Sequence, residues 1–307
     1  MRYLERYRAM LGLAGVLLAA PAVAQEGIYV EELDLRLEQV YVTVTRRGEP
    51  VPGLGPEDFQ LKDDGVAQSL VTAASGDLPF TAVVLMDSSV SMEGRQLRDA
   101  VEGVRAFTSA MEENDEVRLA IFDHDLLYAS PFVQDPAALA VPTETLSGTG
   151  GTAVFDHLYW ALRVLELRFG RPVVILLSDG EDVHSILDMT EVREEVRRSQ
   201  AMLYWLRLEE ANADQLILYG SFREPRESDR QLHALEKAVR ESGGRVLPVR
   251  GSRAIHGALQ EVLAELRAQY ALGYYPDPPG GDGRWHRLEV KARGARVRVR
   301  DGYFAFP

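Results

Sequence analysis

The chain has 307 residues, 46% of them hydrophobic, which is enough to bury the core of one large domain and a smaller one. Its net charge of −13 argues against a nucleic-acid partner and against charge-driven binding to anionic membranes. The absence of cysteine excludes disulfides, a lipid-modified cysteine, a thiolate nucleophile and a zinc–thiolate site, so the core must hold the fold together.

Residues 1–24 have the three-part layout of a secretory signal peptide. Arginines precede an apolar segment at residues 10–20, and Ala22-Val23-Ala24 forms a small-residue cleavage site. An uncleaved membrane anchor is the weaker alternative, because the apolar segment is short for a bilayer span. Cleavage after Ala24 would remove three arginines and one glutamate and change the net charge from −13 to −15. We therefore expect a periplasmic or secreted protein with no transmembrane segment in the mature chain.

Residues 25–77 have the pattern of a β segment. Valines at positions 40, 42 and 44 alternate with more polar residues, which is the period of a half-buried strand. Gly, Pro and Asp cluster at residues 47–50, 52–56 and 63–65, where we expect turns, and residues 56–59 are compatible with a short helical turn.

Strands and helices alternate over residues 78–268. Apolar runs predict strands at residues 83–86, 117–122, 173–177, 202–206 and 246–249. Apolar residues at helical spacing predict helices at residues 97–111, 154–165 and 255–266. This alternation favours an α/β fold with a doubly wound, mostly parallel sheet. Residues 209–229 have mixed charge and contain Gly220 and Pro225, and we interpret them as an insertion or a long surface loop.

Residues 269–307 return to a β pattern. Apolar residues alternate at 288–292 and 297–299, and Gly294-Ala295 lies between them as the expected hairpin turn. Because a lone hairpin is barely stable in water, we expect it to pack with the N-terminal segment in a small β-sandwich into which the α/β domain is inserted. The basic residues of this segment are interpreted as a solvated outer face: Arg284, Arg287, Lys291, Arg293, Arg296, Arg298 and Arg300.

The apolar run that ends at Asp87 carries the main functional signal. Residues 80–86 predict a strand buried on both faces, and Asp87, Ser89 and Ser91 follow at alternate positions. They would emerge at the carboxyl end of the strand, where ligands bind in open α/β sheets. Three hard oxygen ligands there indicate a divalent cation, Mg²⁺, Ca²⁺ or Mn²⁺. The alternative is that the serines satisfy loop backbone groups and cap the following helix.

Two later segments bring further oxygen ligands to the same edge. A glycine-rich run ends at Thr152, just before the helix expected at residues 154–165, and the buried run at residues 173–177 leads to Asp179. Five residues together resemble the metal-ion-dependent adhesion site of von Willebrand factor type A domains: Asp87, Ser89, Ser91, Thr152 and Asp179. The resemblance implies that the first three bind the ion directly or through water, whereas Thr152 and Asp179 exchange direct and water-mediated contact when a ligand arrives.

The flanking segments resemble a family of bacterial exported proteins related to von Willebrand factor type A. The resemblance covers nearly all of the mature chain and constrains architecture and location more than biological role. The segments that carry this resemblance are Val42-Thr43-Val44 through Gly53-Leu54, Asp58-Phe59, Asp64-Gly65, Tyr274-Tyr275-Pro276 and the ending Val299-Arg300-Asp301-Gly302-Tyr303.

The resemblance implies a metal-dependent protein-binding module that is not an enzyme. A cation held mainly by hydroxyls is incompletely neutralised and can accept an acidic oxygen from another molecule. An Asp or Glu of a partner protein would then complete the coordination. One alternative is an envelope protein in which the cation only stabilises the fold. A metal-assisted hydrolase has less support.

Three other groups of polar residues are weaker candidates. Glu181 and Asp182 could add metal ligands, although such residues are more often part of a solvated loop. Residues 123–125, Asp-His-Asp, could form an accessory cation site, although a polar turn is favoured. Ser88 with His157 or His184 would suggest a nucleophile and base, but no nucleophile elbow is recognisable.

Overall fold

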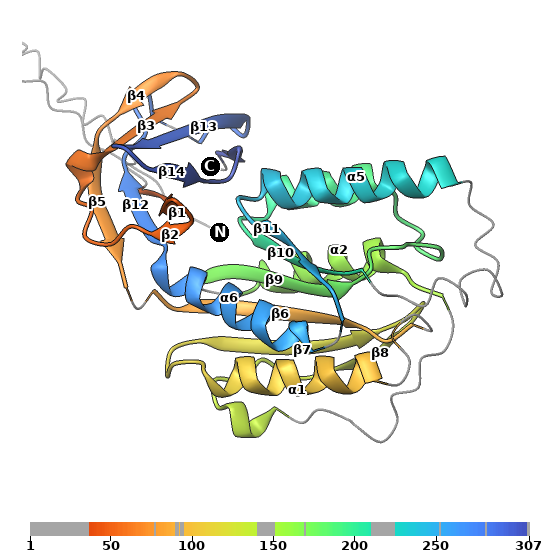
Figure 1. Ribbon diagram of the computed structural model, residues 1–307. Coiled ribbons are helices and arrows are strands. Elements are labelled where there is room, and N and C mark those ends of the chain that lie inside the picture. Colours follow the sequence, from red (N-terminus) through yellow and green to blue (C-terminus); the bar gives the residue numbers. More distant parts are fainter. Residues whose placement is uncertain are drawn as a thin grey trace, which may run out of the picture. The chain divides into compact units, whose positions relative to one another are not determined.

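The computed structural model describes residues 37–76, 78–89, 92, 95–139, 151–168, 170–209, 225–251, 253–279 and 281–305 (Figure 1). Ser91 and the signal peptide expected at residues 1–24 lie outside this part of the chain. Among the described helices, none combines the length and the apolar character that a bilayer span requires.

A six-stranded sheet has the strand order β11-β10-β9-β6-β7-β8. All neighbouring strands are parallel except β8, which is antiparallel to β7. The strands are β6 (Phe80–Asp87), β7 (Glu116–Phe122), β8 (Leu126–Ala129), β9 (Arg171–Ser178), β10 (Met202–Leu208) and β11 (Arg245–Val249). The five strands expected from apolar runs are confirmed. The edge strand β8 was missed, because its exposed Leu126 and Leu127 have neither an alternating nor a buried pattern.

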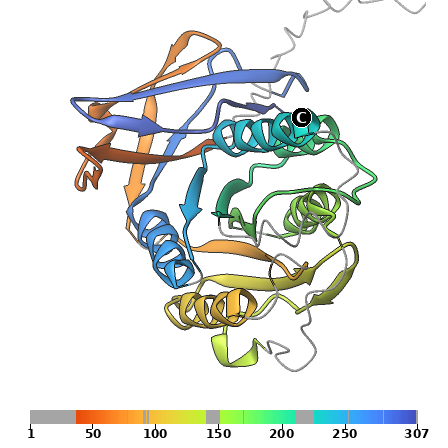
Figure 2. The ribbon, with the colours of Figure 1, turned by 45° about the vertical axis from the view of Figure 1, so that its right-hand side comes forward.

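Helices cover both faces of this sheet (Figure 2). Apolar residues of α1 and α6 pack on one face, and those of α2, α3 and α5 pack on the other. Leu97, Val101 and Val104 of α1 show why: they recur at helical spacing and are all buried. The expected α/β fold with a doubly wound, mostly parallel sheet is therefore confirmed. The helices are α1 (Arg95–Ser109), α2 (Val154–Leu165), α3 (Met189–Arg198), α5 (Pro225–Glu241) and α6 (Ala254–Ala268), with a short 3-10 turn at Pro136–Ala138.

Helix α5 begins within residues 209–229, which we expected to form an insertion or loop. Pro225 is its first residue, a position where the missing N–H of proline costs no helical hydrogen bond. Leu235, Ala238 and Val239 then form a buried stripe against the sheet. The expectation of a loop is therefore wrong for residues 225–229, while residues 210–224 lie outside the described part.

Strands from both ends of the chain form two further sheets. One has the order β14-β1-β12-β5, with β2 paired to β1, and the other has the order β15-β13-β3-β4. Val42 of β1, Leu61 of β3 and Leu272 of β12 belong to one buried core that the two sheets share, which confirms the small β-sandwich. The elements are β1 (Glu38–Arg46), β2 (Glu49–Pro50), a 3-10 turn (Pro56–Asp58), β3 (Phe59–Asp63), β4 (Val66–Gln68), β5 (Leu70–Ser75), β12 (Tyr270–Tyr274), β13 (Trp285–Ala292), β14 (Arg296–Arg298) and β15 (Gly302–Phe304).

The turn expected around Gly294 is present, but the two strands beside it do not pair with each other as a hairpin. β13 pairs with β3 and β15, whereas β14 pairs with β1 in the other sheet, and a single bridge between Ala292 and Ala295 joins the two strands. Gly294, with φ of +66°, lies in the turn where the chain leaves the sheet of β13 and enters the sheet of β14. The two strands separate because β13 pairs with β3 and β14 pairs with β1, two strands of the N-terminal segment that lie in different sheets.

The C-terminal basic residues are not all part of a solvated face. Arg300 is 9% exposed and its Nε–H donates to the Gly302 carbonyl. Arg298 forms an ion pair with Glu265 of α6, and its Nε–H donates to the Gly243 carbonyl at 3.0 Å. These two side chains turn inward because β14 and the segment after it pass beside the ends of α5 and α6. The remaining basic residues of the run are exposed, as expected.

Candidate metal centre

Asp87 is the last residue of β6, and its side chain is fully buried. Its Oδ1 accepts a hydrogen bond from the backbone N–H of Ser89 at 2.8 Å. Its Oδ2 accepts one from the hydroxyl of Ser178 at 2.7 Å. Ser178 ends β9, which runs parallel to β6 and places this hydroxyl beside the carboxylate. Both donors are neutral, so they satisfy the oxygens of Asp87 without compensating its charge.

A second carboxylate adds to the cost of ionising Asp87. Asp179 directly follows β9. Burial and the charge of Asp179 raise the pKa of Asp87 to about 7, against the opposing effect of hydrogen bonds from Ser89 and Ser178. Burial and Asp179 also raise the pKa of Glu181. A divalent cation at this edge would relieve the repulsion, and the donor set of carboxylates and hydroxyls fits a hard cation.

A glycine turn positions Asp179. Gly180 has φ of +86°, and its N–H donates to the Ser178 hydroxyl at 3.0 Å. A Cβ at this position would lie 2.1 Å from Cζ2 of Trp205. Trp205 is fully buried in β10, and its Nε1–H donates to the Ser178 carbonyl at 3.0 Å. Asp179 itself accepts the backbone N–H of Glu181 at 3.0 Å. The backbone at this turn is therefore closely packed against a large aromatic side chain.

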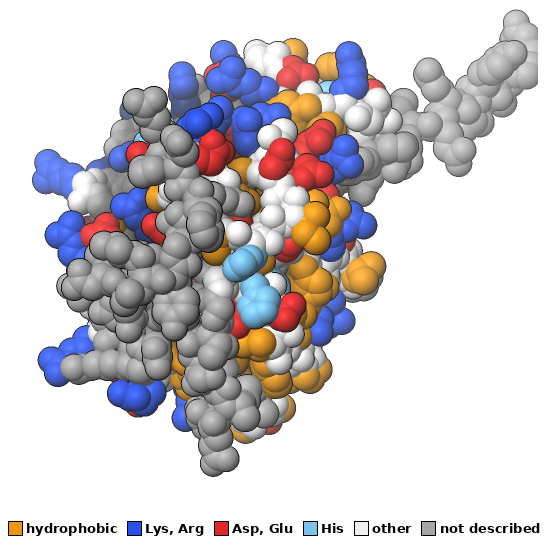
Figure 3. Space-filling model, turned by 90° about the vertical axis from the view of Figure 1, so that its right-hand side faces the viewer, with side chains coloured by type: hydrophobic (Ala, Val, Ile, Leu, Met, Phe, Trp, Pro, Cys, Tyr) orange, Lys and Arg blue, Asp and Glu red, His pale blue; other side chains and the backbone are white. Residues whose placement is uncertain are grey.

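Thr152 precedes α2 and lies between the loops that follow β7 and β9. Its carbonyl accepts the N–H of His184 at 3.0 Å, and the N–H of Ala153 donates to the Asp123 carbonyl at 3.0 Å. β7 and β9 are the two neighbours of β6, so these bonds bring Thr152 to the sheet edge where Asp87 lies. The threonine is 6% exposed. Figure 3 looks onto this side of the molecule, where histidine side chains lie beside an acidic one.

The structure describes four of the five predicted site residues at this edge of the sheet. They are Asp87, Ser89, Thr152 and Asp179, whereas Ser91 lies outside the described residues. Ser178 is a further residue of this site that was not predicted from the sequence. In the sequence, Ser178 is only a hydroxyl residue at the end of an apolar run. Its partner, Asp87, follows from the alignment of β9 with β6 in the structure.

Two of the weaker candidates satisfy backbone groups instead. Asp182 is 4% exposed, and its Oδ2 accepts the N–H of Phe155 at 2.9 Å. Asp182 thus caps the first turn of α2, because Ala153, the residue before the helix, has no side chain that can accept a hydrogen bond. Asp123 accepts the N–H of Asp125 at 2.8 Å, which is the geometry of a polar turn.

Ser88 and His157 are both engaged with backbone carbonyls. The Ser88 hydroxyl donates to the Phe122 carbonyl at 3.1 Å. Nδ1 of His157 lies 2.6 Å from the Ala153 carbonyl, and its ring stacks on that of Phe122 with centroids 4.6 Å apart. Burial lowers the pKa of His157. This histidine packs against the end of β7 and holds the first turn of α2.

Residues 82–181 match the model of the von Willebrand factor type A domain family. The chain therefore carries a von Willebrand factor type A domain, and the matched residues run from β6 to the turn after β9. A 113-residue segment is 30% identical to an uncharacterized protein of Synechocystis sp., covering 35% of this chain and 26% of that protein. The chain thus spans about a quarter of the length of the curated relative that it matches.

Two solved structures are also similar to this chain. A von Willebrand factor type A protein from Catenulispora acidiphila is 14% identical with a TM-score of 0.49, over 85% of this chain and 75% of that one. An aerotolerance-related membrane protein from Bacteroides fragilis is 18% identical with a TM-score of 0.42, over 61% of this chain and 99% of that one.

Proposed function

We propose that the sheet edge at Asp87 binds a divalent cation, which in turn receives an Asp or Glu side chain of a partner protein. The protein would then be a metal-dependent binding module and not an enzyme. The environment of Asp87 supports this most strongly. Its carboxylate is fully buried and accepts hydrogen bonds from neutral groups, and the nearby charge of Asp179 raises its pKa further. The ligands would be Asp87, Ser89, Ser91, Thr152 and Asp179, and the ion Mg²⁺, or alternatively Ca²⁺ or Mn²⁺.

The donor set explains why such an ion would recruit a partner. Three of the five ligands are neutral hydroxyls, and while Asp179 contacts the ion only through water, Asp87 is the one carboxylate bound directly, so the ion stays incompletely neutralised. A six-coordinate Mg²⁺ with at most five protein ligands keeps a position for water. A carboxylate from another protein can displace that water and form a charge-assisted contact.

We also propose that the protein is exported. The layout of residues 1–24 supports a signal peptide, and cleavage after Ala24 would release a chain made of the β segment at residues 25–77, the α/β domain at 78–268 and the C-terminal β segment at 269–307. The cation site would then face partners in the periplasm or outside the cell.

Isothermal titration of Mg²⁺ into chelator-treated protein tests the metal site. Asp87→Asn keeps the shape of the side chain but removes its charge, so we expect the binding heat to be lost. Asp125→Asn is the matched control, because Asp125 is an exposed acid on a loop at the same sheet edge and should leave binding unchanged. Equal Mg²⁺ binding by Asp87→Asn and the wild type would contradict the proposal.

Crosslinking in the native envelope with mass-spectrometric identification tests the partner. We expect EDTA and Asp87→Asn to remove the same crosslinked proteins, while the melting temperature changes only modestly. If the cation is purely structural, EDTA should lower the melting temperature strongly. The fraction of the chain that stays folded in EDTA should still crosslink to the same partner proteins. That result would refute the binding role without refuting the metal site.

A further inference from the structure

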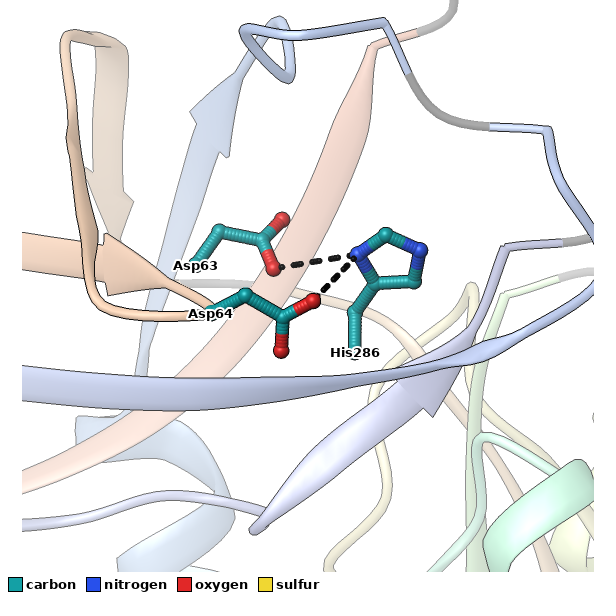
Figure 4. Close-up of side chains that lie close together, drawn as sticks. All are labelled: Asp63, Asp64 and His286. Carbon is teal, nitrogen blue, oxygen red and sulfur yellow. Dashed lines mark ion pairs between the residues drawn. The ribbon is translucent and has the colours of Figure 1, made fainter.

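Two carboxylates and an imidazole converge in the β-sandwich (Figure 4). Asp63 ends β3, Asp64 begins the turn to β4, and His286 lies on β13. β3 and β13 are antiparallel with Asp63 opposite Leu288, so His286, two residues before Leu288, lies on the same face of the sheet as Asp63. One ligand atom from each of the three residues lies within 4.8 Å of the other two.

The two distances from the imidazole nitrogen suit a single ion. Nδ1 of His286 lies 3.5 Å from Oδ1 of Asp63 and 3.3 Å from Oδ2 of Asp64. In a tetrahedral zinc site with bonds of about 2.0–2.1 Å, neighbouring ligand atoms are about 3.4 Å apart. The imidazole nitrogen therefore stands at the separation from each carboxylate oxygen that a shared zinc ion requires.

Asp63 supplies an independent indication of a ligand. It is 5% exposed, and its Oδ2 accepts hydrogen bonds from the hydroxyls of Tyr274 and Tyr303, each at 2.8 Å. Its Oδ1 makes no hydrogen bond within the described part of the chain. This oxygen points toward the histidine ring, as Figure 4 shows. A buried carboxylate oxygen without a hydrogen-bond donor is costly, and a cation between it and the ring would satisfy it.

The surroundings of His286 match those of a metal-binding histidine. Its Nε2 is 3.0 Å from Oδ1 of Asp282, and a carboxylate at the far nitrogen commonly orients a metal-binding imidazole and increases its basicity. The ring also stacks on Tyr303. Arg284 pairs with Asp282 at 2.6 Å. With a neutral imidazole, the three carboxylates and this one guanidinium leave two negative charges, which a divalent cation would balance.

We propose that Asp63 Oδ1, Asp64 Oδ2 and His286 Nδ1 form a second cation site, selective for Zn²⁺ and separate from the Asp87 edge. An imidazole with two carboxylates favours Zn²⁺ over Mg²⁺ and Ca²⁺, which prefer all-oxygen sites. The side chain of Asp64 is 54% exposed, so the fourth position opens to solvent and takes water. The ion would fasten the N-terminal β segment to the C-terminal one.

Titration of Zn²⁺ into the chelator-treated full chain in excess Mg²⁺ tests the site, with Co²⁺ absorption as a second probe of an imidazole–carboxylate site. We expect one Zn²⁺ per chain and a melting temperature about 5 °C higher at a hundred times the Kd. Asp64→Asn should weaken binding at least tenfold. It keeps an amide oxygen that can accept the N–H of Arg287, as Oδ1 does at 2.8 Å, so the turn should stay folded.

Three further variants separate this site from adventitious zinc binding. His286→Gln should abolish binding, and Asp282→Asn should weaken it by about 10–100-fold without changing the Co²⁺ spectrum. His124→Gln is the matched control, because its two nitrogens lie 3.1 and 3.4 Å from two different carboxylates, and it should bind like the wild type. Wild-type affinity in Asp64→Asn and His286→Gln, or loss of binding in His124→Gln alone, would overturn the proposal.

Discussion

Replacing Gly180 with alanine tests how closely the turn after β9 is packed. Two costs are expected. The φ of +86° disfavours a residue with a Cβ by about 1–2 kcal/mol. The new Cβ would also lie 2.1 Å from Cζ2 and 2.7 Å from Cη2 of Trp205, well inside van der Waals contact. The indole cannot move away freely, because it is fully buried and its N–H is bound to the Ser178 carbonyl.

The free energies add to a large destabilisation. Overpacking a buried side chain costs about 1–3 kcal/mol, so the total for Gly180→Ala is about 2–5 kcal/mol. Gly48→Ala is the matched control, because Gly48 has φ of +91° and no atom within 4 Å of the added Cβ. Its cost should be the conformational one alone, about 1–2 kcal/mol.

Urea unfolding monitored by circular dichroism measures both variants. The difference between them isolates the contact with Trp205, and in a Trp205→Leu background the cost of Gly180→Ala should fall to that of the control. Equal losses in the two single variants, or an undiminished loss in the Trp205→Leu background, would show that the contact with the indole does not limit this turn.

Two further predictions concern buried charges. Arg171 is 1% exposed and donates hydrogen bonds to two backbone carbonyls and to Gln269. Arg171→Met should therefore lower the free energy of unfolding, measured by urea denaturation, by about 3–5 kcal/mol. A loss below about 1 kcal/mol would contradict this prediction. Burial acts to raise the pKa of Glu241, but the hydrogen bonds and charge of Arg193 outweigh it and lower that pKa below 4.5. The ionised Glu241 side chain therefore stabilises the folded state above about pH 4.5, and this contribution is lost as the pH falls through the lower pKa of the folded state. In a plot of melting temperature against pH, Glu241→Gln should therefore show a shallower fall on the acid side than the wild type.

The sequence predicted the sheet well because its strands are buried on both faces. Such strands appear as uninterrupted apolar runs, and the rule that parallel strands end at one edge then brings Asp87 and Asp179 together. The contact between Asp87 and Ser178 was beyond prediction, because it depends on the alignment of β6 with β9, in which Met86 lies opposite Leu177. Nothing within either run determines that alignment.

The Asp63–Asp64–His286 cluster was harder to find for a related reason. The Asp-Asp-Gly string predicts a turn, and the φ of +46° at Asp64 agrees with it. His286, however, appeared as an isolated histidine, and its proximity to the turn arises from the pairing of β13 with β3 across most of the chain. The inward direction of Arg298 likewise depends on which sheet β14 joins.

The α/β domain connects to the sandwich through two strands that lie side by side. β5 leads into the domain and β12 leads out of it, and Ser75 lies opposite Tyr270 where both leave the sandwich. Tension between the α/β domain and the sandwich would therefore pull both strands in the same direction. Because β5 is an edge strand, the load passes to the five residue pairs between β1 and β12, from Glu38–Tyr274 to Val42–Tyr270. That ladder would be loaded in shear along its whole length, so its hydrogen bonds would have to break together and not one pair at a time.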